Sequence, residues 1–402
     1  MTGERAAISI RGRPRGRALL NQRGQRRWEF NPLVRSRVRA DDEVVNTPTT
    51  ATARARGIAN FEARGPLSAQ LLSALSLSPE EGSEALDSFP SEIDEAIASA
   101  SSVMTDDDLQ LTLFILYGLH YGGVVDADDR WEWNPTTIAA RVAIETAFER
   151  ELRAAVTLPE LPVPDAEAVA QALFELTADD GGPSLSKFIA AKASREQLVE
   201  LVAQRSIYTL KEADPHSWAI PRLGGRAKVA MVEIQADEYG GGRPERMHAT
   251  IFARMMRAMG LDDTYGSYVD NVPALTIASF TMMSMFGLNR RLRGAITGHL
   301  SAFEMTSSIP SGLYARGLRR LGYGDDVTQY YDEHVEADAV HEQIAARDLA
   351  GGLAESEPQL LADIMFGAAA CLLMDGLVGQ HIFSAWSEGR SSLRLPLEGT
   401  DV

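Results

Sequence analysis

Apolar residues recur at helical spacing along most of the chain from about residue 56 onward, and no stretch alternates apolar and polar residues as an exposed strand does. Before the proline-rich stretch 157–166, the pattern predicts helices near 66–76, 90–102, 105–121 and 136–155, with a loop at 122–135. After it, helices are predicted near 194–213, 225–238, 244–259, 273–286, 288–306, 311–321, 325–349 and 358–388. The sequence therefore predicts an all-α fold.

The first 55 residues lack this periodicity and are predicted to form a disordered, Arg-rich tail. Residues 1–40 contain eleven arginines and two glutamates, a net charge of about +9, so a total of −17 leaves about −26 on the remainder. Such an acidic body argues against nucleic acid as a partner. The Arg26-Arg27 pair resembles a twin-arginine export signal, but further arginines follow where an apolar stretch is required, so export is not predicted.

The chain has one cysteine, Cys371, so it forms no intrachain disulfide and no thiolate-based zinc or iron–sulfur site. This cysteine usage favours a reducing, cytoplasmic setting, and the apolar neighbours of Cys371 predict a buried, inert thiol. No uninterrupted apolar run approaches the roughly 18 residues that span a membrane, so no membrane contact is expected.

The candidate chemistry starts with His334, Asp338 and His341, which stand at i, i+4 and i+7. On a helix these side chains fall within an arc of about 60°. Four residues upstream could complete a metal site: Glu212, Glu238, His248 and Glu304. Three imidazoles and four carboxylates suit iron or manganese better than structural zinc or magnesium. The competing interpretation is a solvent-exposed charged helix face.

Spacing alone does not decide which of two carboxylates is a ligand. Glu245 precedes His248 by three residues, which is the Glu-x-x-His unit of ferritin-like bundles, and it competes with Glu238. Asp237, Glu336 and His299 are candidates for holding the ligand imidazoles in place.

Four segments carry a resemblance to a known family: LKEADPHSW (210–218), EIQADEYGGGRPERMH (233–248), HLSAFEMTSS (299–308) and YYDEHVEADAVHEQ (330–343). From about residue 105 to 390 the chain resembles the haem-oxygenase-like di-iron oxidases, and most of all their nitrosourea-type N-oxygenase branch. The resemblance implies a haem-oxygenase-like helical bundle with an N-terminal helical extension. It also implies carboxylate ligands at Glu212, Glu238, Glu304 and Asp338 and imidazole ligands at His248, His334 and His341, and it favours Glu238 over Glu245.

The same resemblance suggests an organisation into the tail at 1–55, an N-terminal helical region at 56–160 that mediates homodimerisation, and a di-iron domain at 161–395. It implies two iron ions, dioxygen as co-substrate, an external electron donor and a small-molecule substrate. Members of the nitrosourea-type branch continue into a C-terminal cupin, whereas this chain ends at Val402, so rearrangement to an N-nitroso product is not expected.

The expected reaction is N-oxygenation of an amine or guanidine of a small amino-acid-like metabolite, through a peroxo-di-ferric species. The alternatives are oxidative C–C cleavage or desaturation of an amino or fatty acid by the same kind of centre, and a helical protein that binds iron without catalysis.

Overall fold

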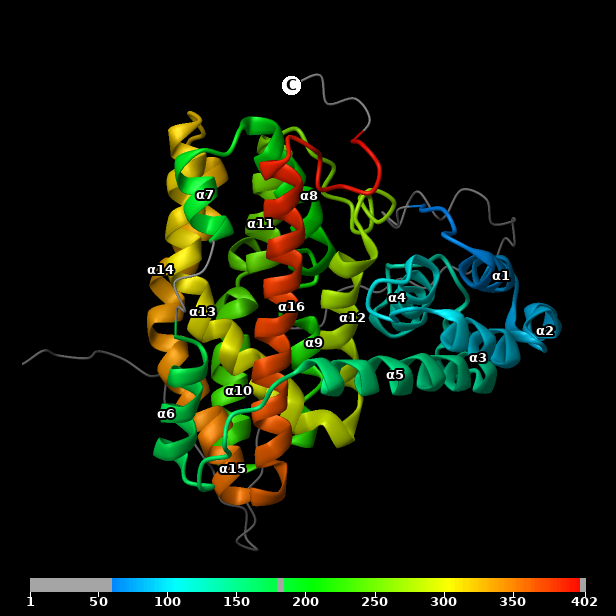
Figure 1. Cartoon of the computed structure of the whole chain (residues 1–402), viewed down its shortest axis with the longest axis horizontal. Coiled ribbons are helices and arrows are strands. Elements are labelled where there is room, and N and C mark those ends of the chain that lie inside the picture. The colour runs from blue at the N-terminus through cyan, green and yellow to red at the C-terminus, as the bar shows by residue number, and fades with distance from the viewer. Residues whose placement is uncertain (1–59, 179–183, 398–402) are drawn as a thin grey trace, which may run out of the picture. The chain divides into compact units, whose positions relative to one another are not determined.

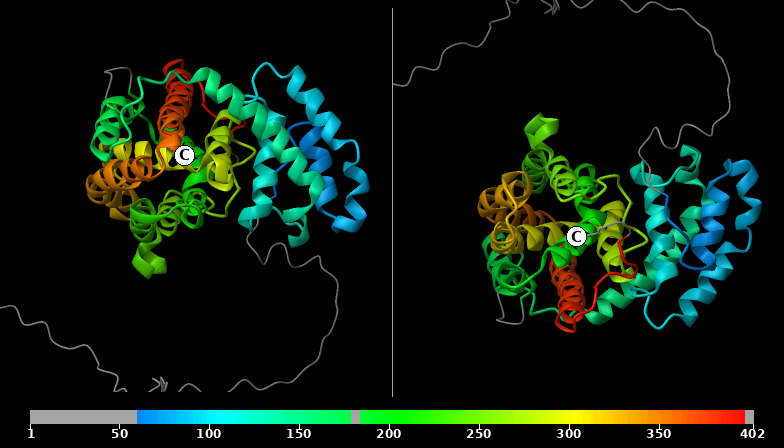
Figure 2. Two further views of the ribbon diagram at one scale, coloured as in Figure 1. Left: turned by 90° about the horizontal axis from the view of Figure 1, so that it is seen from below. Right: turned by 90° about the horizontal axis from the view of Figure 1, so that it is seen from above.

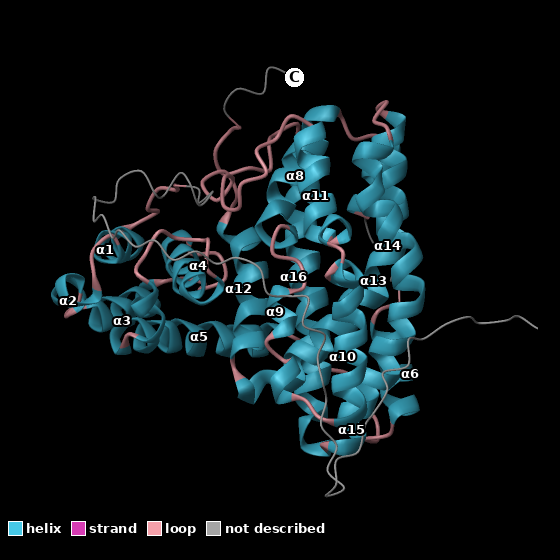
Figure 3. Ribbon diagram, turned by 180° about the vertical axis from the view of Figure 1, so that it is seen from behind, coloured by secondary structure: helices cyan, strands magenta, loops and turns pink. Residues whose placement is uncertain are grey.

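A computed structural model describes residues 60–178 and 184–397, and within these ranges the chain is helical and contains no strand (Figures 1 and 3). The predicted all-α class is confirmed. The tail predicted at 1–55 lies outside the described residues, and the boundary predicted near 160 stays a prediction.

The first five helices form one group beside the rest of the chain (Figure 2): α1 (Pro66–Leu75), α2 (Pro79–Gly82), α3 (Phe89–Ser99), α4 (Asp107–Tyr121) and α5 (Pro135–Ala155). Helix α4 begins where the sequence predicted, because the Asp106 carboxylate accepts hydrogen bonds from the N–H groups of Asp108 and Leu109. Its last residue, Tyr121, stacks on Trp218 with ring centroids 4.4 Å apart. This contact ties the group to the bundle that follows.

The bundle consists of α6 (Ala166–Leu176), α7 (Leu185–Ala191), α8 (Arg195–Thr209), α9 (Asp214–Ser217), α10 (Gly225–Glu238), α11 (His248–Ala258), α12 (Ala274–Leu288), α13 (Arg293–Arg320), α14 (Asp325–Gln343), the π-helical η8 (Ile344–Gly351), α15 (Gly352–Ser356) and α16 (Leu361–Ser387). Short 3₁₀ turns occupy Glu84–Leu86, Asp129–Trp133, Ile220–Arg222, Gly240–Gly242, Pro244–Arg246, Arg290–Leu292 and Pro358–Leu360. Helix α13 contacts both α14 and α16 along its length (Figure 1).

Several predicted boundaries were wrong. One helix, α13, replaces the two predicted at 288–306 and 311–321, because Pro310 is tolerated in its interior. The helix predicted at 325–349 changes to π-helix after Gln343. Helix α11 starts at His248 rather than near residue 244, and α6 and α7 were not predicted.

Helix α16 is, within the described part of the chain, the one helix long and apolar enough to cross a membrane by length and mean hydropathy. It meets this criterion although no uninterrupted apolar run predicted a span. Because 56% of its apolar window is buried, its apolar surface serves the bundle core. Cys371 lies on this helix, and burial raises the pKa of its thiol, so the predicted inert cysteine is confirmed as buried.

Two glycines allow α13 and α16 to cross in backbone contact. A Cβ on Gly298 would lie 1.8 Å from the Ile364 carbonyl oxygen, and one on Gly367 would lie 1.9 Å from that of Ala295. Neither obstacle is a side chain that can swing away. The crossing holds α13 at the position from which it presents Glu304, which lies less than two turns beyond Gly298.

The Gly298→Ala variant should therefore lose about 3 kcal/mol of unfolding free energy, because the helices must separate to admit the methyl group. Urea unfolding followed by circular dichroism measures this. Gly312→Ala is the matched control on the same helix: its Cβ would meet only the Val335 side chain at 3.7 Å, so stability should rise by up to about 1 kcal/mol. Equal stability of the two variants would contradict the proposed contact.

Candidate metal centre

Six of the seven predicted ligands are brought together and buried inside the bundle. They come from the turn after α8 (Glu212), the last residue of α10 (Glu238), the first residue of α11 (His248), the middle of α13 (Glu304) and two positions of α14 (His334 and His341). Their ligand atoms form two groups, each with all atoms within 4.8 Å of one another: Glu212, Glu238, His248 and His334 in the first, and Glu238, Glu304 and His341 in the second.

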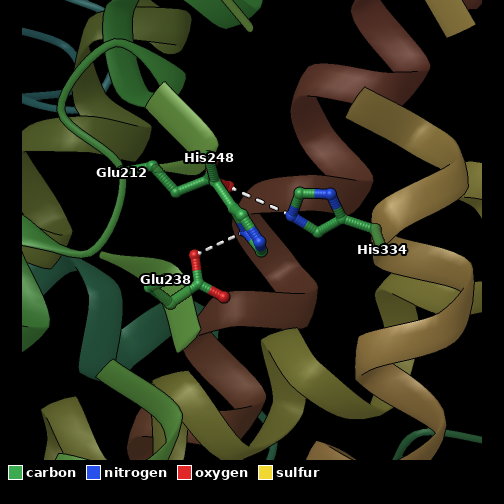
Figure 4. Close-up of side chains that lie close together, drawn as sticks. All are labelled: Glu212, Glu238, His248 and His334. Carbon is green, nitrogen blue, oxygen red and sulfur yellow. Dashed lines mark ion pairs between the residues drawn. The ribbon is translucent and has the colours of Figure 1, made fainter. Parts of the chain in front are cut away.

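The first group has its nitrogen and oxygen atoms turned toward one another (Figure 4). Nδ1 of His248 lies 3.0 Å from a carboxylate oxygen of Glu238, and Nε2 of His334 lies 3.6 Å from one of Glu212. Nδ1 of His334 lies 2.7 Å from the carbonyl oxygen of Tyr330. Donation by Nδ1–H to this carbonyl places the lone pair of the neutral ring on Nε2, the atom that would bind a metal ion.

The second group is built on His341. Its Nδ1 lies 3.4 Å from a carboxylate oxygen of Glu304, while its Nε2 lies 3.1 Å from Asp237. The ring is therefore held from outside by one carboxylate and faces another inside. Asp237 thus occupies the supporting position that was predicted for it.

The two groups share Glu238, so a single carboxylate reaches both sets of ligands. A further observation supports metal binding by these residues. Nδ1 of His248 and Nδ1 of His341 are buried and make no well-aligned hydrogen bond among the described residues, although each forms an ion pair with the carboxylate that it faces, Glu238 or Glu304. Buried nitrogen atoms are rarely left without such a bond, and both face carboxylates across the space that an ion would fill. Each group could hold a metal ion, and Glu238 belongs to both groups.

Comparison with known proteins agrees with this geometry. Residues 199–376 match the model of a family described as iron-containing redox enzymes. This stretch is therefore similar to iron-containing redox enzymes. All seven predicted ligands lie within the matched range.

The chain also aligns with a nitrosourea synthase from Streptomyces achromogenes subsp. streptozoticus, with 25% identity over 217 residues. The alignment covers 52% of this chain and 45% of the relative, so this chain spans about half the length of that protein. The resemblance inferred from the sequence is confirmed for the family and for this relative.

Within the matched stretch, glycines bring Glu238 and His248 together. Gly240, Gly241 and Gly242 all have positive φ, and a Cβ on Gly240 would lie 2.6 Å from the backbone nitrogen of Met247. The chain can therefore reverse within a few residues between α10 and α11. This reversal places the last side chain of one helix against the first side chain of the next.

Backbone strain marks the position of Glu212. The following residue, Ala213, is the one non-glycine residue with positive φ in the described ranges, at 74°. The side-chain amide of Gln235 donates to the Ala213 carbonyl oxygen at 2.7 Å and helps to hold this conformation. The strained turn directs Glu212 inward instead of continuing α8 to residue 213 as predicted.

The carboxylates and imidazoles of the site shift one another's pKa. Burial and the nearby Glu238 raise the pKa of Glu304. Burial lowers the pKa of His341, but neighbouring carboxylates, led by Glu304, outweigh this and raise it to about 9. Burial likewise raises the pKa of Glu212, but interactions with His334 outweigh it and lower the pKa. With a pKa of about 9, a protonated His341 offsets part of the carboxylate charge in the metal-free protein, as a bound cation would.

The structure does not place the remaining predicted residues among these ligand groups. Glu245 is exposed and precedes α11, so the helical Glu-x-x-His unit does not form. His299 pairs with His216 at 3.1 Å rather than with any proposed ligand, so its predicted supporting role was wrong. The side chains of Asp338 and Glu336 lie outside the described part of the structure, and Asp338 stays a predicted ligand.

One supporting residue was missed. The hydroxyl of Tyr330 donates to Glu212, at 2.8 and 3.0 Å from the two carboxylate oxygens, and its carbonyl oxygen contacts His334. Tyr330 precedes His334 by four residues on α14, a spacing that places both on one helix face. That spacing was the available signal, although it does not reveal Glu212 as the partner.

Proposed function

We propose that this chain is a non-haem di-iron oxygenase that N-oxygenates an amine or guanidine of a small amino-acid-like metabolite. The observation that carries the proposal is the pair of buried ligand groups that share Glu238. The family match supports iron and redox chemistry, and the printed name of the aligned relative, a nitrosourea synthase, supports reaction at nitrogen.

The charges of the proposed ligands suit two ferrous ions. Glu212, Glu238, Glu304 and Asp338 carry −4 when ionised, which balances +4 from the metals and leaves a neutral site in a poorly solvated core. When bound, two ferrous ions would supply the electrons and coordination positions with which dioxygen is activated. One oxygen atom of dioxygen then enters the substrate and the other becomes water, and this reaction requires two electrons from an external donor.

The protein's own residues have distinct roles in this proposal. Tyr330 positions Glu212 through its hydroxyl and His334 through its carbonyl oxygen, and Asp237 orients His341 from the outer side. Burial of all six described ligands keeps bulk water from the reacting atoms. Glu212, Glu238, Glu304 and His334 also line a cavity that can admit a substrate.

The test is an anaerobic titration of the metal-free protein with ferrous ion, followed by rapid mixing with oxygenated buffer. We expect two irons per chain and a transient absorbance that decays faster in the presence of an amine or guanidine substrate. A transient whose decay yields alkenes or shortened acids would indicate the C–C cleaving alternative. Iron uptake without any oxygen-dependent change would contradict an oxygenase and favour iron binding without catalysis.

A further inference from the structure

The ligand Glu212 stands near the start of a short segment with a strained backbone, residues 211–218, here called the Glu212 segment. Ala213 has a φ of 74°, a conformation that costs free energy for any residue with a Cβ. Such a conformation persists only where the surrounding structure holds it. The four-residue helix α9 follows at once and ends one residue before the segment does. The position of Glu212 therefore depends on the contacts that hold this segment.

Helix α10 holds the first half of the Glu212 segment. The side-chain amide of Gln235 donates to the Ala213 carbonyl oxygen at 2.7 Å, and the Tyr239 hydroxyl donates to the Asp214 carboxylate at 2.8 Å. Gln235 and Tyr239 stand on either side of Glu238 in the sequence. These hydrogen bonds thus join the backbone beside one ligand to the helix that carries another.

Helices α4 and α12 hold the far end of the segment. Trp218 stacks on Tyr121, the last residue of α4, with ring centroids 4.4 Å apart and ring planes at 21°. The Tyr121 hydroxyl lies 2.9 Å from that of Ser284 on α12. Helix α12 also touches the backbone of the segment, since a Cβ on Gly287 would lie 2.0 Å from the Pro215 carbonyl oxygen. The stacked pair therefore packs beside a backbone contact that leaves no free space.

The N-terminal helices contact the other end of the segment as well. The Lys211 ammonium group donates to the carbonyl oxygen of Gly122, the residue after α4, at 3.3 Å. This hydrogen bond is exposed to solvent, so the stack of Tyr121 on Trp218 is the stronger of the two contacts. Two consecutive residues at the end of α4 thus contact the segment on both sides of its strained turn.

These contacts concern one ligand group and not the other. Glu212 belongs to the first group, whereas the second consists of Glu238, Glu304 and His341. Movement of the Glu212 segment therefore removes a carboxylate from the first group and leaves the second complete. This asymmetry separates a positioning role from a general contribution to stability.

We propose that the N-terminal helices position Glu212 for metal binding, with Tyr121 and Trp218 as the positioning residues. The stacked rings fix the far end of the Glu212 segment, and the strained turn at Ala213 then directs the carboxylate into the first ligand group. Without the stack, Ala213 relaxes to negative φ and Glu212 turns away. This inference rests on the proposed function only in taking Glu212 as a metal ligand.

The test is calorimetric titration of the metal-free protein with ferrous ion, without oxygen. In Tyr121→Ala, one iron should bind with unchanged affinity and the other at least about tenfold more weakly, because affinity falls with the fraction of molecules that have Glu212 in place. Tyr121→Phe keeps the stack and loses only the hydroxyl, so it should bind both irons as the unaltered protein does. Tyr121→Leu retains apolar volume without a flat ring; it should weaken the same iron and replaces Tyr121→Ala if that variant does not fold.

Further variants distinguish positioning from a loss of packing. Ala213→Gly, added to Tyr121→Ala, should recover part of the lost affinity, because glycine adopts positive φ without strain. Trp218→Ala should weaken the same iron, and adding Tyr121→Ala to it should have no further effect, since both remove one contact. Trp133→Ala removes an exposed aromatic side chain that precedes α5; it is the matched control and should bind both irons normally.

Amide hydrogen exchange of the metal-free protein gives a measurement that needs no iron. The N–H group of Ser217 donates to the Ala213 carbonyl oxygen at 3.0 Å, so exchange in a peptide that covers residues 211–218 reports on the held turn. This exchange should be faster in Tyr121→Ala than in the unaltered protein and unchanged in Tyr121→Phe. Peptides of α14 should exchange alike in all three proteins.

The positioning role is overturned if folded Tyr121→Ala binds two irons with unaltered affinities, if both irons weaken equally, or if exchange of the Glu212 segment does not change. Its failure is separable from that of the proposed function. Selective weakening of one iron in a protein without oxygen chemistry would sustain the role of Tyr121 and reject the oxygenase. Equal weakening with normal oxygen chemistry would reject the positioning role alone, and an unaltered protein that binds no iron would reject both.

Discussion

Glu238→Ala should abolish stoichiometric binding of both iron ions, because this carboxylate is the one residue common to the two ligand groups. Its removal leaves three ligands in the first group and two in the second, and nothing to bridge them. We expect the ferrous titration to fall from two irons per chain to less than one, and the oxygen-dependent absorbance change to disappear. The fold should persist, because metal-free Glu238 adds electrostatic repulsion to the buried Glu304.

The matched control is Glu245→Ala, which removes an exposed carboxylate seven residues further along the chain. It should bind two irons and react with oxygen as the unaltered protein does. Circular dichroism of both variants checks that each is folded. Loss of iron from Glu245→Ala with normal behaviour of Glu238→Ala would restore the Glu-x-x-His alternative and reject the bridging role.

His341→Ala should lose one iron and retain the other. His341 belongs only to the second group, while the first keeps all four of its residues. We expect one iron per chain and loss of all oxygen-dependent turnover, since the proposed reduction of dioxygen requires both metals. Helix content should be unchanged, because water can fill the gap that the imidazole leaves.

The control for His341→Ala is His381→Ala, on α16. His381 contacts the carbonyl oxygen of Ser392 through Nε2 and belongs to neither ligand group. Iron content and the oxygen reaction of this variant should match the unaltered protein. Normal turnover in His341→Ala, or two irons bound to it, would contradict the assignment of the second metal position.

Most helices could be predicted from the sequence because each has an apolar face and local start or stop signals. The cap at Asp106, the break at Gly240–Gly242 and the long apolar run of α16 are visible without a structure. The prediction placed a break between 306 and 311, where Pro310 stands, whereas packing of α13 against α14 and α16 maintains the helix through this position. Short α6 and α7 have too few turns to give a clear periodic signal.

The sequence by itself determined the helical class, the stripe of His334, Asp338 and His341 and the preference for iron or manganese, because these depend on residue type and on spacing within a single helix. It left Glu238 and Glu245 as spacing alternatives until family resemblance favoured the first. Only the tertiary structure decided that Glu238 is buried against His248, that it belongs to two groups, and that Tyr330 holds Glu212. Contacts between distant helices depend on how those helices pack, and helical periodicity carries no information about which faces meet.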